Sequence, residues 1–483
     1  MSEQVSYVEE LTDKSDDFSR WYTEVILKAQ LADYAPVRGC MVIRPYGYAL
    51  WENMQRLLDA RFKATGHQNA YFPLLIPESF LAREAEHVAG FAPVVAWVTQ
   101  GGSEQLEERL AIRPTSEAII GVMYSKWIQS WRDLPVLINQ WCNVLRWEKV
   151  TRLFLRTTEF LWQEGHTVHR TEEEAEEETL RMLNVYRAFI EEDLAIPVVA
   201  GRKTEAEKFK GALRTYSVEA MMGDGKALQA GTSHNLGQHF ARVFDITFQD
   251  MDGERKFAWQ TSWGVSTRLI GAIIMVHGDD SGLILPPRVA PTQVIVIPIW
   301  RKEQEKEQVA RFVERVRSSI GSGVRFKEDW DDEHTPGWKF NEWELRGVPL
   351  RLEVGPRDVR SEQVVLVRRD NRAKETVPVE RLQARVLELL EQIQRDMLER
   401  ARGFMAERTR RVESFEEFRT FAEQQRGFLL AHWCGDPECE ARIKDETAAT
   451  IRCIPLEPEL AEEGACVWCG QPSGRRVVFG RAY

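Results

Sequence analysis

The chain of 483 residues has no hydrophobic run long enough to cross a membrane, and its first residues do not have the pattern of a signal peptide. A membrane-spanning helix needs roughly 18–20 consecutive apolar residues, and no run approaches that length. Residues 1–6 lack the basic region and apolar segment of a secretory signal. We therefore expect a cytoplasmic protein that makes no contact with membranes.

The chain also lacks an excess of positive charge. It has 64 lysine and arginine residues against 75 aspartate and glutamate residues, a formal net charge of −11. A hydrophobic content of 43% and a charged content of 29% are typical of soluble globular proteins. At about 150 residues per domain, the length predicts about three domains. This composition excludes a dominant basic field, although not a local basic groove.

None of the common phosphate-binding signatures occurs in the sequence. There is no Walker pattern G-x-x-x-x-G-K-[ST], and no G-x-G-x-x-G follows an expected strand. The His-Ile-Gly-His and Lys-Met-Ser-Lys-Ser signatures of Rossmann-type synthetases are also missing. A nucleotide site in this chain would therefore belong to neither the P-loop class nor the Rossmann class.

Cysteine is scarce and unevenly placed. There are seven cysteines, and five of them lie beyond residue 430. In a large chain without a signal peptide, a metal site explains this crowding better than disulfides do. Cys434-x4-Cys439 and Cys466-x2-Cys469 have the spacing of two zinc knuckles and predict one structural zinc ion, in an appended domain apart from catalysis. Cys453 is interpreted as a buried neighbour, and replacement of one ligand is the alternative.

Three segments place arginine or glutamate inside otherwise apolar stretches: residues 113–117, 145–166 and 262–271. Removing a charge from water is expensive unless a partner or a ligand compensates. Arg156 and Glu159, inside an apolar run, are the clearest example of charges expected to be buried. For a single residue an internal ion pair explains the pattern about as well, but three such segments favour a ligand site.

Arginine is well suited to hold phosphate groups, because its planar fork donates two parallel hydrogen bonds. Arg146, Arg156 and Arg268 lie in the second and third of these segments. They predict a site for a nucleoside triphosphate.

Hydrophobic periodicity places these segments on expected elements. Apolar runs at 136–145 and 154–162 predict a long antiparallel hairpin. A capping box opens an acidic helix over 172–195, whose glutamates at 172–178 are interpreted as a solvated face. Further strand or strand-to-helix segments are expected at 227–237 and 257–276.

Prolines within residues 285–291 predict a linker between domains. Beyond it, strand and helix patterns predict a compact α/β unit of about 100 residues. Its elements are expected at 293–299, 302–320, near 324, 350–354 and 364–367. Residues 379–425 are expected to be mostly helical.

Together the segments resemble the prolyl-tRNA synthetases, a family of class II aminoacyl-tRNA synthetases. The resemblance covers residues 20–483, and it is closest to the archaeal and eukaryotic-like type with a zinc-binding C-terminal domain. Residues 39–77 resemble motif 1, which builds the dimer interface of this class, 146–166 resemble motif 2, and 264–271 resemble motif 3. The segments that resemble sequences specific to the prolyl enzymes are 113–117, 161–166 and 232–234.

The resemblance implies a fold of the α/β (α+β) class. The expected domains are a class II catalytic domain with an antiparallel sheet (1–284), an α/β anticodon-binding domain (285–390), and a helical linker with a small zinc-binding C-terminal α/β domain (391–483). The implied activity joins L-proline to ATP, with Mg²⁺, as prolyl-adenylate and then transfers the prolyl group to the 3′ end of tRNA(Pro). The implied partners are ATP, L-proline, tRNA(Pro) and a second copy in a homodimer.

The resemblance also assigns roles to single residues. Arg146 is expected at the α-phosphate and Arg268 at the γ-phosphate, and with Arg156 they are the expected catalytic residues. The residues expected to bind ATP are Arg146, Glu148, Arg156, Gln229, Thr232, Ser266 and Arg268. The residues expected to bind proline are Thr115, Glu117, Phe160, Trp162, His166 and His234. For each histidine a satisfied structural role is the alternative.

Proline anticodons end in two guanines, whose Watson–Crick edge offers N–H donors and whose O6 and N7 atoms accept hydrogen bonds. A reader therefore needs carboxylates together with arginine or lysine. The segment 338–358 supplies both, and the candidates are Glu344, Arg351 and Asp358. A solvated sheet edge explains each residue alone about as well.

Residues 167–261 are too few for the large editing insertion of bacterial-type prolyl enzymes, so no editing in cis is expected. Because an apolar pocket separates substrates that differ by one methylene by only ~1–3 kcal/mol, alanine and cysteine should be misactivated. The C-terminal residues 481–483 are either frayed or docked.

Two other functions are possible from the sequence. The first is a threonyl, seryl, glycyl or histidyl synthetase, which the segments 115–117 and 162–166 disfavour. Threonyl enzymes place a cysteine zinc ligand in the active site, but Cys142 is interpreted as a core residue. The second is a synthetase-like regulator or RNA-binding protein without catalysis, which the presence of all three arginines disfavours.

Overall fold

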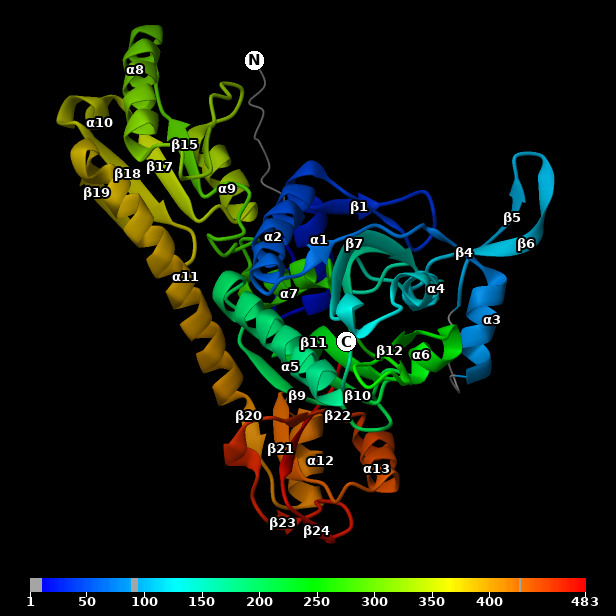
Figure 1. Cartoon of the computed structure of the whole chain (residues 1–483). Coiled ribbons are helices and arrows are strands. Elements are labelled where there is room, and N and C mark those ends of the chain that lie inside the picture. Colours follow the sequence, from blue (N-terminus) through cyan, green and yellow to red (C-terminus); the bar gives the residue numbers. More distant parts are fainter. Residues whose placement is uncertain (1–10, 88–93, 425–426) are drawn as a thin grey trace.

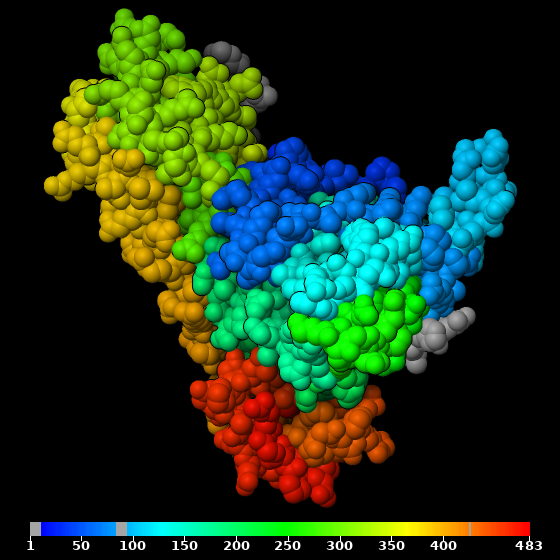
Figure 2. All heavy atoms as spheres, in the orientation of Figure 1, coloured from blue at the N-terminus to red at the C-terminus, as the bar shows by residue number. Residues whose placement is uncertain are grey.

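The computed structural model describes residues 11–87, 94–424 and 427–483 and has three lobes (Figures 1 and 2). The first ten residues, on which the expected absence of a signal peptide rests, lie outside the described residues. A central lobe separates a second lobe, drawn in light green and yellow, from a C-terminal lobe, drawn in orange and red. Within the described ranges, no helix has the length and apolarity needed to cross a membrane.

The central lobe is built around an antiparallel sheet. Across the sheet the strands follow the order β9-β10-β11-β14-β8-β7, and each neighbouring pair is antiparallel. A short strand, β3, pairs in parallel with β7 at one edge. The bounds are β3 (Gln68–Asn69), β7 (Val136–Leu145), β8 (Glu159–His169), β9 (Val198–Arg202), β10 (Arg214–Met221), β11 (Ala227–Gly237) and β14 (Trp259–Ser266). This is the antiparallel sheet expected for the first domain.

Helices and short hairpins surround this sheet. Three helices, α1 (Phe18–Lys28), α2 (Pro45–Ala64) and α5 (Glu172–Ala188), bury their apolar residues in the core that the sheet also supplies, and α7 (Arg268–His277) is almost entirely buried there. The hairpin β5–β6 projects away from the lobe (Figure 1). The remaining elements are β1 (Ala32–Tyr34), β2 (Met41–Ile43), β4 (Leu75–Pro77), α3 (Glu78–His87), β5 (Trp97–Gly101), β6 (Glu104–Ile112), α4 (Glu117–Trp127), α6 (His239–Phe244), β12 (Thr247–Gln249) and β13 (Arg255–Phe257).

Alternation along the strands gives the sheet two different faces. On the α5 face, Gln163 accepts a hydrogen bond from the Tyr186 hydroxyl at 2.7 Å. Trp263 is buried there directly opposite Gly165 in the β8–β14 register. A Cβ atom on Gly165 would lie 2.1 Å from the indole ring, so only glycine fits this position. The residues on either side of it, Glu164 and His166, face the other way.

The expected hairpin is present, but its second strand begins at Glu159 and not at Phe154. Residues 153–155 form a buried turn, in which Phe154 has a φ of 61°. The Tyr22 hydroxyl donates to the Leu153 carbonyl at 2.8 Å. These apolar residues therefore anchor a loop in the core and do not form a strand.

The acidic helix is shorter than the range 172–195 that the sequence predicts. α5 ends at Ala188, and a π-helical turn follows over Phe189–Asp193. Only half of the predicted capping box is present: the Glu174 amide donates to Thr171 Oγ1 at 3.2 Å, but the Glu174 carboxylate accepts from the Arg170 amide at 2.9 Å and not from that of Thr171. The interpretation of residues 172–178 as a solvated face is wrong for Glu178. That side chain is buried, 2.9 Å from His67 Nε2 and 2.7 Å from Arg181.

The second lobe has its own five-stranded sheet, in the order β16-β15-β17-β18-β19. β15 is parallel to β16 and β17, and the remaining pairs are antiparallel. The bounds are β15 (Val294–Pro298), α8 (Glu303–Ile320), β16 (Phe326–Glu328), α9 (Pro336–Leu345), β17 (Leu350–Val354), α10 (Pro356–Ser361), β18 (Gln363–Arg368), β19 (Lys374–Pro378) and α11 (Leu382–Glu407). The elements expected over 293–367 are confirmed within a few residues.

The proline-rich segment that joins these two lobes is buried. Leu285, Val289 and Ala290 belong to the core of the central lobe. The Leu283 amide donates to the Leu345 carbonyl at 3.0 Å, and the Leu285 amide donates to Gly347 at 3.2 Å. The expected linker is therefore a fixed seam between the lobes.

The C-terminal lobe continues the central sheet. Its strand β22 pairs with β9 through Ile454 and Pro455, which extends the sheet to eleven strands from β20 to β3. The bounds are β20 (Thr409–Arg411), α12 (Phe415–Gln424), β21 (Phe428–His432), α13 (Pro437–Thr447), β22 (Thr450–Pro455), β23 (Gly464–Ala465), β24 (Pro472–Ser473) and β25 (Arg476–Gly480). The expected C-terminal domain is therefore joined to the central sheet by strand pairing, and the separation of its metal site from catalysis stays a prediction.

A buried cluster of charges strengthens this junction. Glu219 of β10 lies 2.7 Å from Lys203 Nζ and 2.9 Å from an Arg452 nitrogen of β22. Lys203 Nζ also donates to the Arg452 carbonyl at 2.6 Å. All three side chains are buried. Arg452 of the C-terminal lobe thus compensates part of the negative charge of Glu219 in the central sheet.

Candidate active site

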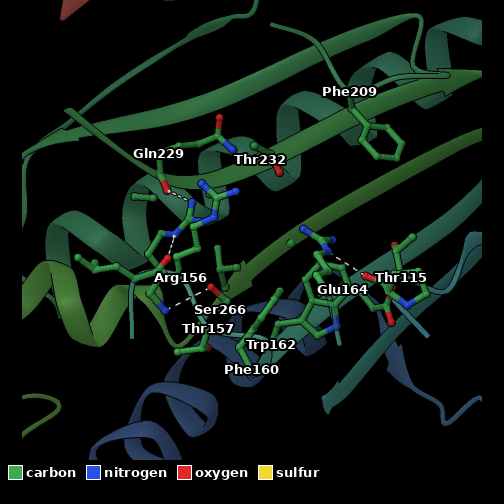
Figure 3. Close-up of a pocket in the computed structure, with 18 of the residues that line it drawn as sticks. Thr115, Arg156, Thr157, Phe160, Trp162, Glu164, Phe209, Gln229, Thr232 and Ser266 are labelled. Atoms are coloured by element: carbon green, nitrogen blue, oxygen red, sulfur yellow. Dashed lines mark hydrogen bonds between the residues drawn. The ribbon is translucent and has the colours of Figure 1, made fainter. Parts of the chain in front are cut away.

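A cavity of about 810 Å³ opens on the face of the central sheet opposite α5 (Figure 3). In the register, Trp162, Glu164 and His166 of β8 stand beside Ser266, Gly264 and Ser262 of β14. Thr232 and His234 of β11 follow on the same face, because they pair with Gly264 and Ser262. Thus alternate residues of three strands form the floor of the cavity. It brings together every residue expected to bind ATP or proline: Thr115, Glu117, Arg146, Glu148, Arg156, Phe160, Trp162, His166, Gln229, Thr232, His234, Ser266 and Arg268.

Two of the three predicted arginines are held by neutral carbonyl groups. Arg146 directly follows β7, and its Nε donates to the Pro114 carbonyl at 3.0 Å. Arg268, the first residue of α7, donates to the carbonyls of Leu155 at 3.1 Å and Gln229 at 3.4 Å. Desolvation in the cavity lowers the pKa of both, and repulsion from Arg146 further lowers the pKa of Arg268. An anionic ligand would stabilise this pair of charges.

The third arginine, like Arg146, is exposed to solvent. The side chain of Arg156 is 63% exposed and lies 2.7 Å from Glu148, another residue expected to bind ATP. Glu159 is also exposed, and it accepts a hydrogen bond from Asn143 at 2.8 Å. The expectation that Arg156 and Glu159 are buried charges is therefore wrong, although Arg156 lines the cavity.

Among the residues expected to bind proline, Thr115 lies away from Arg156 and Gln229, and Phe160 and Trp162 lie between them (Figure 3). The Thr115 hydroxyl donates to the Glu117 carboxylate, and both side chains are buried. The rings of Phe160 and Trp162 meet edge to face, 5.9 Å apart. The Arg146 guanidinium lies 5.3 Å from the Trp162 ring centroid. The acidic and aromatic candidates for proline binding thus lie in the same cavity as the arginines expected to bind phosphate, and Trp162 is next to Arg146.

Glu164 is a buried carboxylate that the sequence analysis did not select. It accepts hydrogen bonds from Gln140 at 3.0 Å, from the Ser116 amide at 3.2 Å and from His166 Nε2 at 2.9 Å. Burial alone would raise the pKa of Glu164 and lower that of His166. The hydrogen bond and the charge attraction between them outweigh burial, so that the pKa of Glu164 is lowered and that of His166 is raised. Both groups therefore favour their charged forms.

His234, in contrast, is held as a neutral imidazole. Burial, and after it the charge of His166, lower the pKa of His234 to about 3. The Phe209 amide donates to Thr215 Oγ1 at 3.0 Å, and this oxygen lies 2.9 Å from His234 Nδ1. The ring of Phe209 lies 4.9 Å from that of His234.

The C-terminal residue is docked at the cavity. Its amide donates to the Ala227 carbonyl at 3.2 Å, and Ala482 forms a bridge to Ala227. The Tyr483 ring lies 4.6 Å from Lys226 Nζ and 5.3 Å from the Arg152 guanidinium. Burial, with the nearby charge of Asp224, raises the pKa of its phenol. Of the two sequence alternatives, docking is therefore the correct one.

Glu164, Phe209 and Tyr483 are among the cavity residues that the sequence analysis did not select, and the reason differs for each. Glu164 alternates with Trp162 and His166, so the two-residue period of a strand could have identified it. Phe209 lies in a loop without a motif. Tyr483 is brought to the cavity by pairing between lobes, which no local pattern reveals.

The four predicted metal ligands meet in the C-terminal lobe. The sulfur atoms of Cys434, Cys439, Cys466 and Cys469 all lie within 4.8 Å of one another. Those of Cys434 and Cys439 are 3.8 Å apart, and those of Cys434 and Cys469 are 3.7 Å apart. Tetrahedral Zn–S bonds of about 2.3 Å place sulfur atoms about 3.8 Å apart, so the cluster fits a structural metal ion. Cys453 is buried in β22, outside this cluster.

Two of the three anticodon candidates are in contact. Arg351 of β17 donates to the Glu344 carboxylate at 2.9 Å and lies 3.1 Å from Glu353. The carboxylate of Asp358 accepts from the Gly355 amide at 2.8 Å and so caps α10. Whether these residues read an anticodon stays a prediction.

Three family models match successive parts of the chain. "tRNA synthetase class II core domain (G, H, P, S and T)" matches residues 97–277, and "Anticodon binding domain" matches residues 293–389. The antiparallel sheet, with its arginines at the positions of motifs 2 and 3, agrees with the first match. The protein is thus a class II aminoacyl-tRNA synthetase in fold. A third model, "Prolyl-tRNA synthetase, C-terminal", matches residues 415–483.

Relatives match the chain over its whole length. The proline–tRNA ligase of Natranaerobius thermophilus is 60% identical over 479 residues, which are 99% of each chain. That of Rubrobacter xylanophilus is 61% identical, again over 99% of each chain, and that of Symbiobacterium thermophilum is 58% identical over 100% of each chain. The chain belongs to the prolyl-tRNA synthetase family.

Proposed function

We propose that the protein is a proline–tRNA ligase, which activates L-proline with ATP and transfers the prolyl group to tRNA(Pro). The observation that carries this proposal is that one cavity contains Arg146 and Arg268 together with Thr115, Glu117 and Trp162. It offers positive charge for a triphosphate beside an acidic and aromatic pocket for a small cationic ring.

In the first proposed step, a carboxylate oxygen of proline attacks the α-phosphorus of ATP, and the bond to pyrophosphate breaks. Proline already carries a carboxylate, so positioning and charge stabilisation can supply most of the catalysis. Arg146 is proposed to hold the α-phosphate and Arg268 the γ-phosphate. Further contacts to the nucleotide are proposed for Glu148, Arg156, Gln229, Thr232 and Ser266. Mg²⁺ that arrives with ATP would neutralise phosphate charge.

Proline recognition is proposed to depend on charge as well as shape. Thr115 and Glu117 would accept the two N–H groups of the secondary ammonium, and Phe160 and Trp162 would pack against the ring. His166, charged and paired with Glu164, would close the floor of the pocket. A neutral His234 would avoid repulsion of the substrate ammonium at the pocket wall.

In the second proposed step, a ribose hydroxyl of the terminal adenosine attacks the prolyl carbonyl carbon, and AMP leaves. The second lobe is proposed to read the anticodon through Glu344, Arg351 and Asp358. The match of the anticodon-binding model to residues 293–389 supports this assignment. The proposed division of the chain is 1–284 for catalysis, 285–390 for the anticodon, and 391–483 for the linker and C-terminal domain.

A zinc ion, held by the four cysteines, is proposed to stabilise the C-terminal lobe. The protein is proposed to work in the cytoplasm, where its seven cysteines would stay reduced. A homodimer through residues 39–77 is also proposed. It is supported by Val42, Tyr71 and Leu75, large apolar side chains that are exposed there. Light scattering that gave the mass of one chain at micromolar concentration would contradict the dimer.

Proline-dependent exchange of pyrophosphate into ATP tests the proposed activity, because other synthetase activities would require another amino acid. Arg268→Lys should lower the exchange rate by roughly 10²–10³-fold, since a point charge cannot replace the guanidinium fork. Unchanged exchange in this variant would refute the phosphate assignment. Rapid hydrolysis of mischarged alanyl-tRNA by the pure protein would refute the proposed lack of editing.

A further inference from the structure

A buried arginine joins the second lobe to the central lobe. Arg369 directly follows β18 and is 4% exposed. Its guanidinium donates to both carboxylate oxygens of Asp279, at 2.9 and 2.5 Å. Its Nε donates to the backbone carbonyl of Glu344 at 2.8 Å. One side chain thus contacts both lobes, and its two parallel hydrogen bonds to Asp279 form the bidentate arginine–carboxylate geometry.

The Asp279 end of this contact leads to the cavity. Asp279 comes two residues after α7, the helix whose first residue is Arg268. The Asp279 carbonyl accepts from Trp21 Nε1 at 3.0 Å, and Lys14 Nζ donates to the Gly278 carbonyl at 2.7 Å. Nearly all of α7, which lies between Arg268 and these contacts, is buried in the core. At 1.5 Å per residue, α7 spans about 15 Å from Arg268 to His277, two residues before the contact of Asp279 with Arg369.

The Glu344 end leads to the proposed anticodon surface. Arg369 holds the carbonyl of Glu344, while the carboxylate of the same residue accepts from Arg351. The ring of Phe340 lies 4.2 Å from the Arg351 guanidinium, and a second carboxylate, Glu353, also contacts that guanidinium. The Glu344 backbone is thus joined through Arg369 to Asp279 of the central lobe, while its carboxylate is paired with Arg351 at the proposed anticodon surface.

We propose that Arg369 is a positioning residue for transfer to tRNA. It fixes the anticodon-reading side chains relative to the helix that carries Arg268, so that a bound anticodon sets where the acceptor end of the tRNA lies over the cavity. This inference rests on the proposed function. Activation of proline without tRNA does not need the contact, whereas aminoacylation does.

The test compares Arg369→Met with Arg372→Met in the full-length protein. Arg372 is in the same turn and also reaches the central lobe, donating to Ser281 Oγ at 2.6 Å, but it is exposed. Each variant is assayed for proline-dependent pyrophosphate exchange without tRNA. Each is also assayed for aminoacylation of a tRNA(Pro) transcript and of a transcript with one anticodon guanine replaced.

For Arg369→Met we expect exchange within twofold of wild type and an aminoacylation kcat at least tenfold lower. The penalty for the altered anticodon should shrink at least threefold, because the contact that transmits it is missing. Arg372→Met should leave all three quantities within twofold. An equal fall in exchange and aminoacylation, or an undiminished anticodon penalty, would overturn the proposal.

Asp279→Asn provides a milder variant if Arg369→Met does not fold. Its side-chain position is 39% exposed, and asparagine keeps one oxygen acceptor for the fork. The same separation of exchange from aminoacylation is expected, with a smaller loss, and equal losses would again overturn the proposal. A wild-type protein that shows no proline-dependent exchange would instead refute the proposed function.

Discussion

The two outer lobes attach to the central lobe in opposite ways. The C-terminal lobe lengthens the central sheet through β22 and shares a buried charge cluster with it. The second lobe has a separate sheet and meets the central lobe at a seam of backbone hydrogen bonds and one arginine fork. A strand shared by two lobes ties their stability together, whereas a seam lets each lobe keep its own core. The C-terminal lobe is therefore joined to the central lobe by a continuous sheet, whereas the second lobe is joined by side-chain and backbone contacts without a shared strand.

The largest effect should come from the charge cluster at the shared sheet. Glu219→Leu would leave Lys203 and Arg452 buried without their common partner, and should lower the free energy of unfolding by about 3–5 kcal/mol. Denaturant titration of the full chain measures this. Adding Lys203→Met and Arg452→Met should recover most of the loss, because a buried apolar cluster costs no desolvation of charge. A triple variant as unstable as Glu219→Leu would mean that the cluster is not what joins the lobes.

A smaller effect should follow from the metal site. Cys466→Ser should lower the free energy of unfolding by about 2–3 kcal/mol. Since β22 pairs with β9, hydrogen exchange should speed up in both of these strands and stay unchanged in β15–β19. The matched control is Cys40→Ser, a partly buried cysteine outside the cluster, which should change neither. Faster exchange in β15–β19 would contradict the difference between the two attachments.

The smallest effect is a pH dependence of the KM for proline. It should arise in the cavity and not at either attachment between lobes. The raised pKa of His166 means that its pairing with Glu164 contributes fully below about pH 6.5, the unfolded value, and is lost as pH rises through the raised pKa. The lowered pKa of Glu164 means that its contribution is lost only as pH falls below about 4.3. The KM for proline should therefore rise by roughly threefold to tenfold above the His166 pKa.

The two attachments should not respond over that pH range, because they pair arginine or lysine with carboxylates. His166→Gln is the control for the cavity and should give a flat KM profile between pH 6 and pH 9. A wild-type profile that is equally flat would remove His166 from the proline site.

Local patterns were sufficient for much of the site. β11 begins and ends where its pattern predicts, and the arginines of motifs 2 and 3 lie together in the cavity. The four zinc-ligand candidates also meet as their spacing predicts. In each case neighbouring residues in one element, or a short loop, decide the outcome.

Tertiary packing decided what the patterns did not show. The apolar residues 153–155 satisfy a strand pattern, but contacts to Tyr22 and Arg268 hold them as a turn. Glu178 lies in an acidic run, yet His67 and Arg181 bury it. The position of Tyr483 depends on a strand pairing between residues more than 200 positions apart, which no local signal specifies.

The alternation along β8 also restricts how this chain can change in length. Glu164 and His166 face the cavity, while Gln163 and Gly165 between them face α5 and Trp263. Insertion or deletion of one residue in this strand would exchange the two sets, placing the bulky floor residues against the core and the glycine in the cavity. Length variants of the enzyme should therefore be confined to its loops and to the projecting β5–β6 hairpin.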